Sequence, residues 1–195
     1  MALRHAILAA LLEGEASDYD LGFDLHGYDL AKSFDASVAN FWTATPQQLY
    51  RELEKMEAQG LVSARVVEQQ RRPNKRLFSL TEAGRAALYD YTTRRPKPTV
   101  IRDELLVQVQ SLDTGDPKSI REAVQDRQEA ADRKLKRYER LRDRLLLGRT
   151  EAEFLTDAER VGPYLTLARG IAFEQETLRW CEFVLDALSR RADRR

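Results

Sequence analysis

The sequence predicts a mainly α-helical fold in two parts: a winged helix-turn-helix domain with a small β-hairpin wing, followed by an antiparallel, coiled-coil-like helical domain. Three observations predict it: short amphipathic helices near the N-terminus, a strand–turn–strand pattern between residues 61 and 80, and two long apolar stripes in the second half. The prolines at 96 and 98 interrupt a helix. We therefore expect a first domain over residues 1–95 and a second over residues 96–195.

Two short helical patterns open the chain. Apolar residues between positions 3 and 11 recur three and four apart, which indicates a helix that ends near Gly14. The segment 28–34 places Tyr, Leu and Phe at helical spacing and indicates a second helix. Tyr-Asp-Leu occurs at 19–21 and again at 28–30, so two registers for this helix compete. We favour the downstream register, in which the first copy lengthens the loop.

A third helix is predicted to begin after Thr45. A threonine caps the free backbone N–H groups, and Pro46 suits the first helical position. Gly60 ends the helix where a left-handed C-cap residue is expected. The predicted inner stripe consists of Leu49, Leu53 and Met56.

A β-hairpin and a fourth helix follow. Apolar and β-branched residues at 61–67 and 77–80 flank the turn RRPNKR at 71–76, which predicts strand, basic turn, strand. The turn places four cations within six residues, at a hairpin tip where no core needs them. Side chains at such a tip can reach DNA phosphates or the minor groove. Thr81 then opens a helix that runs to about Thr93.

This order of elements is that of a winged helix-turn-helix, in which the third helix enters the major groove of DNA. The carboxamides of Gln47 and Gln48 can donate and accept hydrogen bonds at a base edge. Tyr50, Arg51 and Lys55 are better suited to phosphates. Ordinary solvated helix residues would be the alternative interpretation. The predicted DNA-binding residues are Thr45, Gln47, Gln48, Tyr50, Arg51, Lys55, Arg71, Arg72, Lys75 and Arg76.

The charge pattern supports this placement and argues against other classes of protein. The net charge is zero, but residues 43–80 hold seven Lys or Arg against four acids, whereas residues 13–35 hold seven acids and one Lys. A single cysteine, Cys181, excludes an intrachain disulfide and a multi-cysteine metal site. The two histidines, His5 and His26, lack catalytic or metal-site spacing. We expect no enzyme activity, no cofactor and no metal, and a cytoplasmic protein without an export signal or a membrane span.

Two long helices dominate the second domain. Apolar residues recur about every three and a half positions in each, so the helices need partners along their length. The two would pair with each other and still leave a face uncovered, which predicts docking onto a second copy of the chain. Cys181 lies on one stripe and is expected to be a buried small hydrophobe rather than a redox sensor. The predicted dimerisation residues are Leu105, Ile120, Val124, Leu135, Tyr138, Tyr164, Ile171, Leu178 and Leu185.

Several motifs in order make the chain resemble the PadR family of bacterial regulators. They are LRH at 3–5, GYDL at 27–30, FW at 41–42, TPQQLYRELEKMEAQGLV at 45–62, RPNKR at 72–76 and LTEAGRAAL at 80–88. The resemblance covers about the first 95 residues, and the tail resembles the dimerisation region of the long-tailed subgroup. Residues 18–26 depart from the family pattern.

The resemblance implies a dimer that reads a near-palindromic promoter site and represses transcription until a small effector or signal intervenes. It implies that Tyr50 and Arg51 face DNA, and that Arg72, Lys75 and Arg76 lie in the wing. A winged-helix protein–protein interaction module without sequence-specific DNA binding is the alternative function.

Four aromatic residues near the third helix are candidates for an effector pocket. They could line a site for a planar ligand, although core packing is the favoured interpretation. These residues are Tyr28, Phe34, Phe41 and Trp42.

Overall fold

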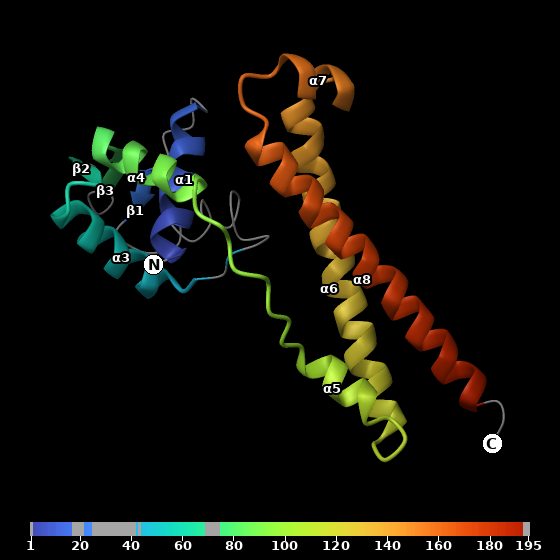
Figure 1. Cartoon of the computed structure of the whole chain (residues 1–195). Helices are drawn as coiled ribbons and strands as arrows, with labels where there is room; N and C mark the ends of the chain where they lie inside the picture. Colours follow the sequence, from blue (N-terminus) through green and yellow to red (C-terminus); the bar gives the residue numbers. More distant parts are fainter. Residues whose placement is uncertain (1, 17–21, 25–41, 43, 69–74, 193–195) are drawn as a thin grey trace. The chain divides into compact units, whose positions relative to one another are not determined.

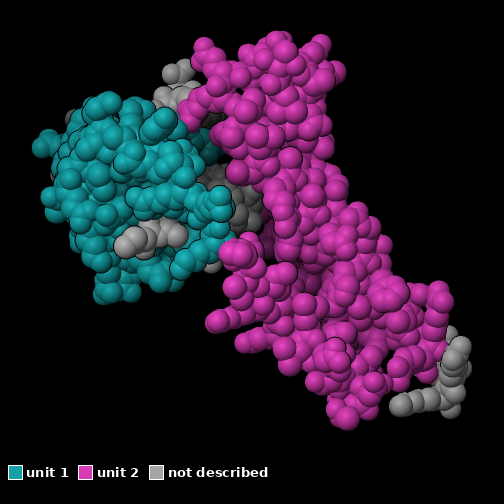
Figure 2. All heavy atoms as spheres, viewed as in Figure 1, with its two compact units in different colours: residues 1–97 teal, residues 98–195 magenta. Residues whose placement is uncertain are grey.

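The structure, a computed structural model, describes residues 2–16, 22–24, 42, 44–68 and 75–192. The chain divides into two compact units, residues 1–97 and residues 98–195 (Figure 2). Each unit has a hydrophobic core of its own. Among the described residues, no helix combines the length and the apolar composition that a bilayer span requires.

The first unit combines helices with a three-stranded antiparallel sheet (Figure 1). The strands lie in the order β1-β3-β2, so β3 is hydrogen-bonded on both sides. The short helices and the hairpin predicted for this part of the chain are confirmed where they are described. The elements are α1 (Ala2–Ala16), β1 (Gly22–Asp24), α3 (Pro46–Ala58), β2 (Val62–Val67), β3 (Lys75–Leu80) and α4 (Glu82–Thr92).

Strand β1 was not expected. It lies just after the first Tyr-Asp-Leu copy, where the sequence predicted only a longer loop, and its Gly22 pairs with Leu77 of β3. A strand of three residues is too short to show the alternation of apolar and polar residues that identifies strands in a sequence. The second helix predicted at 28–34 lies outside the described residues.

Helix α3 packs its predicted inner stripe into the core of the first unit. Leu49, Leu53 and Met56 have no exposed surface, and Gly60 after the helix has a φ of +68°. The left-handed C-cap conformation predicted for this glycine is therefore confirmed. The buried core consists of Ala6, Ile7, Leu8, Ala10, Leu11, Leu49, Leu53, Met56, Val62, Phe78 and Leu80.

Helix α4 is fastened to the turn between α3 and β2. Thr81 caps the helix, and its hydroxyl donates a hydrogen bond of 2.6 Å to the carbonyl oxygen of Gly60. Gly84, in the first turn, lies so close to the carbonyl oxygen of Leu61 that a Cβ atom would overlap it. A side chain at position 84 would thus push the helix away from the end of α3.

The second unit is helical throughout its described elements. Helix α5 starts at Glu104 because Asp103 caps it, and Ile101, before the cap, is 79% exposed. A short helix, α7, lies in the segment between the two long helices. The elements are α5 (Glu104–Gln110), α6 (Pro117–Leu146), α7 (Glu151–Asp157) and α8 (Gly162–Ala192).

Helices α6 and α8 run antiparallel along each other (Figure 1) and bury apolar side chains between them. One cluster joins the start of α6 to the end of α8, with α5 added to it, and consists of Leu105, Ile120, Val124, Cys181, Val184 and Leu188. The other joins the end of α6 to the start of α8 and consists of Tyr138, Leu167 and Ile171.

Two ion pairs accompany these clusters. Glu174 of α8 is only 5% exposed, and its Oε1 atom lies 3.3 Å from Nζ of Lys134 on α6. Arg127 of α6 donates two hydrogen bonds, of 2.7 and 3.0 Å, to the carboxylate of Asp103. This bidentate pair lowers the pKa of Asp103, chiefly through the hydrogen bond from Arg127, and fixes the start of α5 to α6.

Candidate nucleic-acid interface

Thr45 and Gln48 form a capping box at the start of α3. The backbone N–H of Gln48 donates to Oγ1 of Thr45 over 3.2 Å, and the backbone N–H of Thr45 donates to Oε1 of Gln48 over 2.9 Å. The two side chains thereby satisfy backbone donors that the helix itself cannot satisfy. Both glutamines are exposed, but the amide oxygen of Gln48 is engaged by the backbone of Thr45.

The outer face of α3 carries two cations and a carboxamide. Arg51 and Lys55 lie one turn apart and are exposed, as is Gln47 at the N-terminal end. Among the described residues, no ion pair engages Arg51 or Lys55. Tyr50 differs from them because it is half-buried and packs against the core of the first unit.

Two acids of α3 are neutralised from its flanks. Oε1 of Glu52 lies 3.0 Å from Nε of Arg4 on α1, and Oε2 of Glu57 lies 2.5 Å from Nη2 of Arg76 on β3. Both carboxylates are therefore paired with neighbouring elements. The outer face of α3 consequently has a more positive local charge than its composition alone indicates.

The hairpin cations are described only in part. Arg71 and Arg72 lie outside the described residues, and Lys75 is placed as a residue of β3 but its side chain is not described. Arg76 is half-buried and paired. Arg65, an exposed cation of β2 opposite Leu77, was counted in the sequence but not assigned to the site. Strand alternation is the signal that could have identified it.

Of the four aromatic residues predicted to line an effector pocket, only Trp42 is described. It is half-buried and packs against the core of the first unit, in agreement with the favoured interpretation of core packing. Tyr28, Phe34 and Phe41 lie outside the described residues.

Most of the nine residues predicted for dimerisation pack within one chain. Ile120 and Val124 of α6 face Leu188 of α8, and Tyr138 packs with Leu167 and Ile171. Leu105 and Tyr164 are also buried, whereas Leu135, Leu178 and Leu185 are half-buried. The periodic stripes thus account for the pairing of α6 with α8.

A second apolar face of α8 stays exposed. Leu165 is 53% exposed, Phe173 is 53% exposed and Phe183 is 71% exposed. Leu165 and Phe183 are 18 residues apart, which is about five helical turns, so they lie along one line of the helix. Helix α5 also exposes Leu106 and Val107. We call Leu165, Phe173 and Phe183 the outer face of α8.

Cys181 has no exposed surface and lies in the cluster that joins α6 to α8. Burial raises the pKa of its thiol and favours the protonated form, which is the less reactive one. These surroundings agree with the expectation of a buried small hydrophobe.

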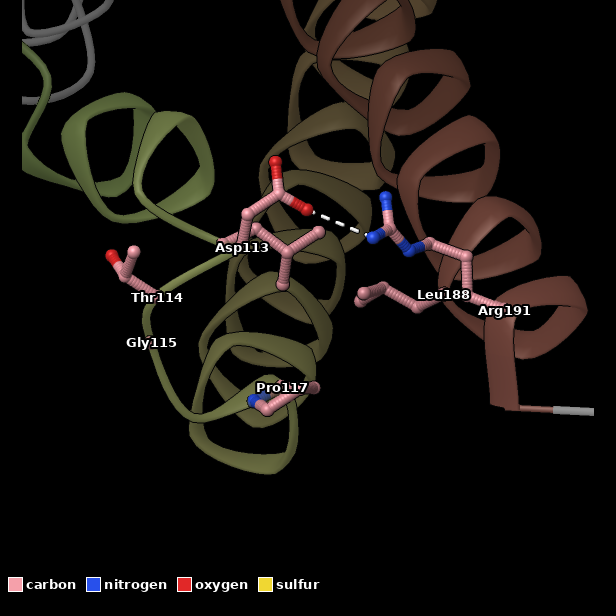
Figure 3. A pocket seen from close by; sticks show the side chains of 7 residues that line it. Asp113, Thr114, Gly115, Pro117, Leu188 and Arg191 are labelled. Atoms are coloured by element: carbon pink, nitrogen blue, oxygen red, sulfur yellow. Dashed lines mark hydrogen bonds and ion pairs between the residues drawn. The ribbon is translucent and has the colours of Figure 1, made fainter. Parts of the chain in front are cut away.

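A pocket of about 480 Å³ lies where the turn between α5 and α6 meets the end of α8 (Figure 3). The guanidinium of Arg191 and the carboxylate of Asp113 are joined across it by a hydrogen bond of 2.8 Å. The lining residues are Leu112, Asp113, Thr114, Gly115, Pro117, Leu188 and Arg191.

Comparison with known families matches both halves of the chain. The model of the transcriptional regulator PadR-like family matches residues 23–90, and a model described as virulence activator alpha C-term matches residues 101–189. A Mycobacterium tuberculosis protein described as a probable transcriptional regulator is 31% identical over 198 residues, which cover 96% of this chain and 98% of the relative. The negative transcriptional regulator PadR of Bacillus subtilis is 26% identical over 94% of this chain and 95% of that protein.

Solved structures give the same fold. Bacillus subtilis PadR in complex with operator DNA has a TM-score of 0.69 at 24% identity and covers 96% of this chain and 99% of that one. The same protein in complex with p-coumaric acid has a TM-score of 0.64 at 23% identity, with coverage of 97% and 99%. The predicted fold, mainly helical with a winged helix-turn-helix domain, is confirmed.

Proposed function

This chain belongs to the PadR-like family of transcriptional regulators, and on that premise we propose that it is a homodimeric repressor of a near-palindromic promoter site. As a member of this family it is a transcriptional regulator and not an enzyme. The observation that carries the proposal is the outer face of α3, where Gln47, Arg51 and Lys55 are exposed while two acids of the helix are paired towards α1 and β3. The chain would bind this promoter site in the cytoplasm.

The outer face of α3 fits the chemistry of the major groove. A carboxamide such as Gln47 can donate and accept at an adenine edge, and Arg51 and Lys55 reach backbone phosphates. The capping box sets where the helix begins, so Gln48 has a positioning role, while its side-chain amide nitrogen remains a donor. The hairpin cations Arg71, Arg72 and Lys75 would then contact DNA beside the groove.

We assign the dimer contact to the outer face of α8, because the residues first predicted for it pack within the chain. Large apolar side chains that are exposed together mark protein interaction surfaces. A second copy would cover Leu165, Phe173 and Phe183 on both chains at once, since a two-fold interface uses the same surface twice. A dimer of this kind would present two copies of α3, one for each half-site.

Repression and relief by an effector extend the proposal. The Bacillus subtilis relative is named a negative regulator, and its structures were solved with operator DNA and with p-coumaric acid. These names support a repressor that a small aromatic acid releases from DNA. Adding p-coumaric acid to the protein–DNA complex tests this step: release of DNA is expected, and retention would exclude this effector for the chain.

The experiment that tests the function is selection of genomic DNA by the purified full-length chain. We expect discrete fragments that carry an inverted repeat, with Arg51→Ala and Lys55→Ala together abolishing their recovery. The matched control is Lys136→Ala, which removes an exposed cation of α6 and is expected to leave recovery unchanged. Random recovery of genomic fragments by the wild-type chain would favour the alternative, a winged-helix module that binds proteins.

A further inference from the structure

Arg76 differs from Arg51 and Lys55, the other predicted DNA-binding cations whose side chains the structure describes, because its guanidinium is held inside the first unit. Its Nη2 atom lies 2.5 Å from Oε2 of Glu57, and its Cζ atom lies 5.1 Å from the centroid of the Phe78 ring. Only 26% of the Arg76 side chain is exposed. Turning this side chain towards a phosphate would sacrifice both the ion pair and the contact with the ring.

The contrast with Arg51 is direct. Both arginines belong to the first unit, but Arg51 is exposed on the outer face of α3, and none of the described residues forms an ion pair with it. An exposed, unpaired guanidinium can take a phosphate without breaking a protein contact. A paired guanidinium over a buried ring, such as that of Arg76, cannot.

The pair joins two elements that DNA binding needs in a fixed relation. Glu57 lies in the last turn of α3, and Arg76 lies in β3, the central strand of the sheet. Along the chain, the hairpin is attached to α3 only through the turn at Gly60. The pair of Arg76 with Glu57 adds a polar contact, from the far strand of the hairpin back to the helix, to the apolar contacts that the hairpin and α3 make in the shared core.

We infer that Arg76 is a positioning residue, which sets the hairpin against α3 and neutralises Glu57 without contacting DNA itself. This inference rests on the proposed function, in which α3 and the hairpin bind the same DNA. An unpaired Glu57 would place a negative charge beside the phosphate-binding surface and weaken binding from that side as well.

The test compares Arg76 with Arg51 in two backgrounds, the full-length chain and its Glu57→Gln variant. The probe is a DNA fragment recovered by genomic selection, titrated at several salt concentrations. We expect Arg76→Gln to weaken binding about fivefold in the wild-type background, as loss of a partly buried ion pair predicts. In the Glu57→Gln background the same change should have less than about a twofold effect, because the partner is already gone.

Arg51→Gln is the matched reference for a phosphate contact. The slope of log K against log salt is negative, and Arg51→Gln should reduce its magnitude by about 0.9 in both backgrounds. Arg76→Gln should leave the slope of the Glu57→Gln variant unchanged. If Arg76→Gln reduced the magnitude of the salt slope of the Glu57→Gln variant by about 0.9, the inference would be overturned and Arg76 would be a phosphate contact.

A measurement without DNA keeps the inference separate from the proposed function. Amide hydrogen exchange in β2 and β3 should be faster in Arg76→Gln and in Glu57→Gln than in the wild-type chain. The double variant should exchange no faster than either single variant. Arg4→Gln breaks an ion pair on a different flank of α3, with Glu52, and should leave exchange in the hairpin unchanged. Exchange in Arg76→Gln equal to that of the wild type would overturn the inference, even if the wild-type chain bound no DNA.

Discussion

Helices α3 and α8 are both amphipathic, yet their outer faces differ in kind. Each buries an apolar stripe, Leu49, Leu53 and Met56 in α3 and Leu167, Ile171 and Cys181 in α8. The outer face of α3 is polar and cationic, whereas that of α8 exposes two phenylalanines and a leucine. The inner stripe of a helix thus reports how the chain folds, and the outer face reports what it binds.

The largest expected effect comes from disrupting the apolar contact between α6 and α8 in the second unit. Ile171→Asp places a carboxylate between α6 and α8, where the native side chain is 8% exposed, and should destabilise the second unit by several kcal/mol. Loss of helical signal in circular dichroism on mild heating would check it. If Ile171→Asp gave a stably folded monomer, this position would belong to the dimer interface after all.

A smaller loss is expected from the outer face of α8. Phe173→Asp with Phe183→Asp should leave each chain folded but weaken self-association about 100-fold or more, because each buried phenylalanine contributes roughly 1.5–3 kcal/mol. Sedimentation velocity over a range of concentrations measures this. The matched control, Glu182→Gln, alters an exposed polar residue of the same helix and should not change the association. An unchanged dimer in the double variant would place the interface elsewhere.

The outer face of α3 should show an effect on DNA and none on assembly. The double variant Arg51→Ala with Lys55→Ala should reduce the magnitude of the negative slope of log K against log salt by about 1.8, as two lost phosphate contacts predict. This double variant should bind DNA at least about tenfold more weakly than the wild-type chain at moderate salt. A salt slope equal to that of the wild type would mean that neither side chain contacts a phosphate.

The start of α3 should show a modest effect on stability. Thr45→Ala removes the capping box and should cost about 1 kcal/mol of unfolding free energy in the first unit. Chemical denaturation measures the change, and Thr45→Ser, which keeps the hydroxyl, is the control. A loss in the serine variant as large as in the alanine variant would argue against a capping role.

The smallest expected effect concerns pH and the anchoring of α5. The pKa of Asp103 is lowered in the folded chain by its hydrogen bonds with Arg127, so the pair contributes stability above the ordinary carboxyl pKa of about 4 and loses it as the pH falls below that value. The partly exposed pair should contribute less than about 1 kcal/mol. Asp103→Asn should flatten this acid dependence in thermal unfolding. The same acid dependence in the variant would assign it to other carboxyls.

Much of the fold follows from local patterns in the sequence. The cap at Thr45, the left-handed Gly60 and the buried stripe of α3 were all predicted, because each depends on residues a few positions apart. Strand β1 was missed because three residues carry no period, and because it forms only through pairing with β3, more than 50 residues later.

The predicted site was less completely determined by the sequence. A cationic residue type does not reveal whether its charge is already paired, and the pairing of Arg76 depends on Glu57, a residue in another element. Similarly, the apolar spacing along α6 and α8 does not distinguish a stripe that packs within the chain from one that packs on a partner. Only the placement of α8 beside α6 separates Ile171, which is buried, from Phe183, which is 71% exposed.

Hydroxyl-radical footprinting on a DNA fragment recovered by genomic selection tests the central claim most directly. We expect the wild-type chain to protect two half-sites about one helical turn, or ~34–36 Å, apart, because each copy of α3 occupies one major groove. Arg51→Ala with Lys55→Ala should lose both protected regions. The same protection by that variant and by the wild-type chain would contradict the assignment of the outer face of α3 to DNA.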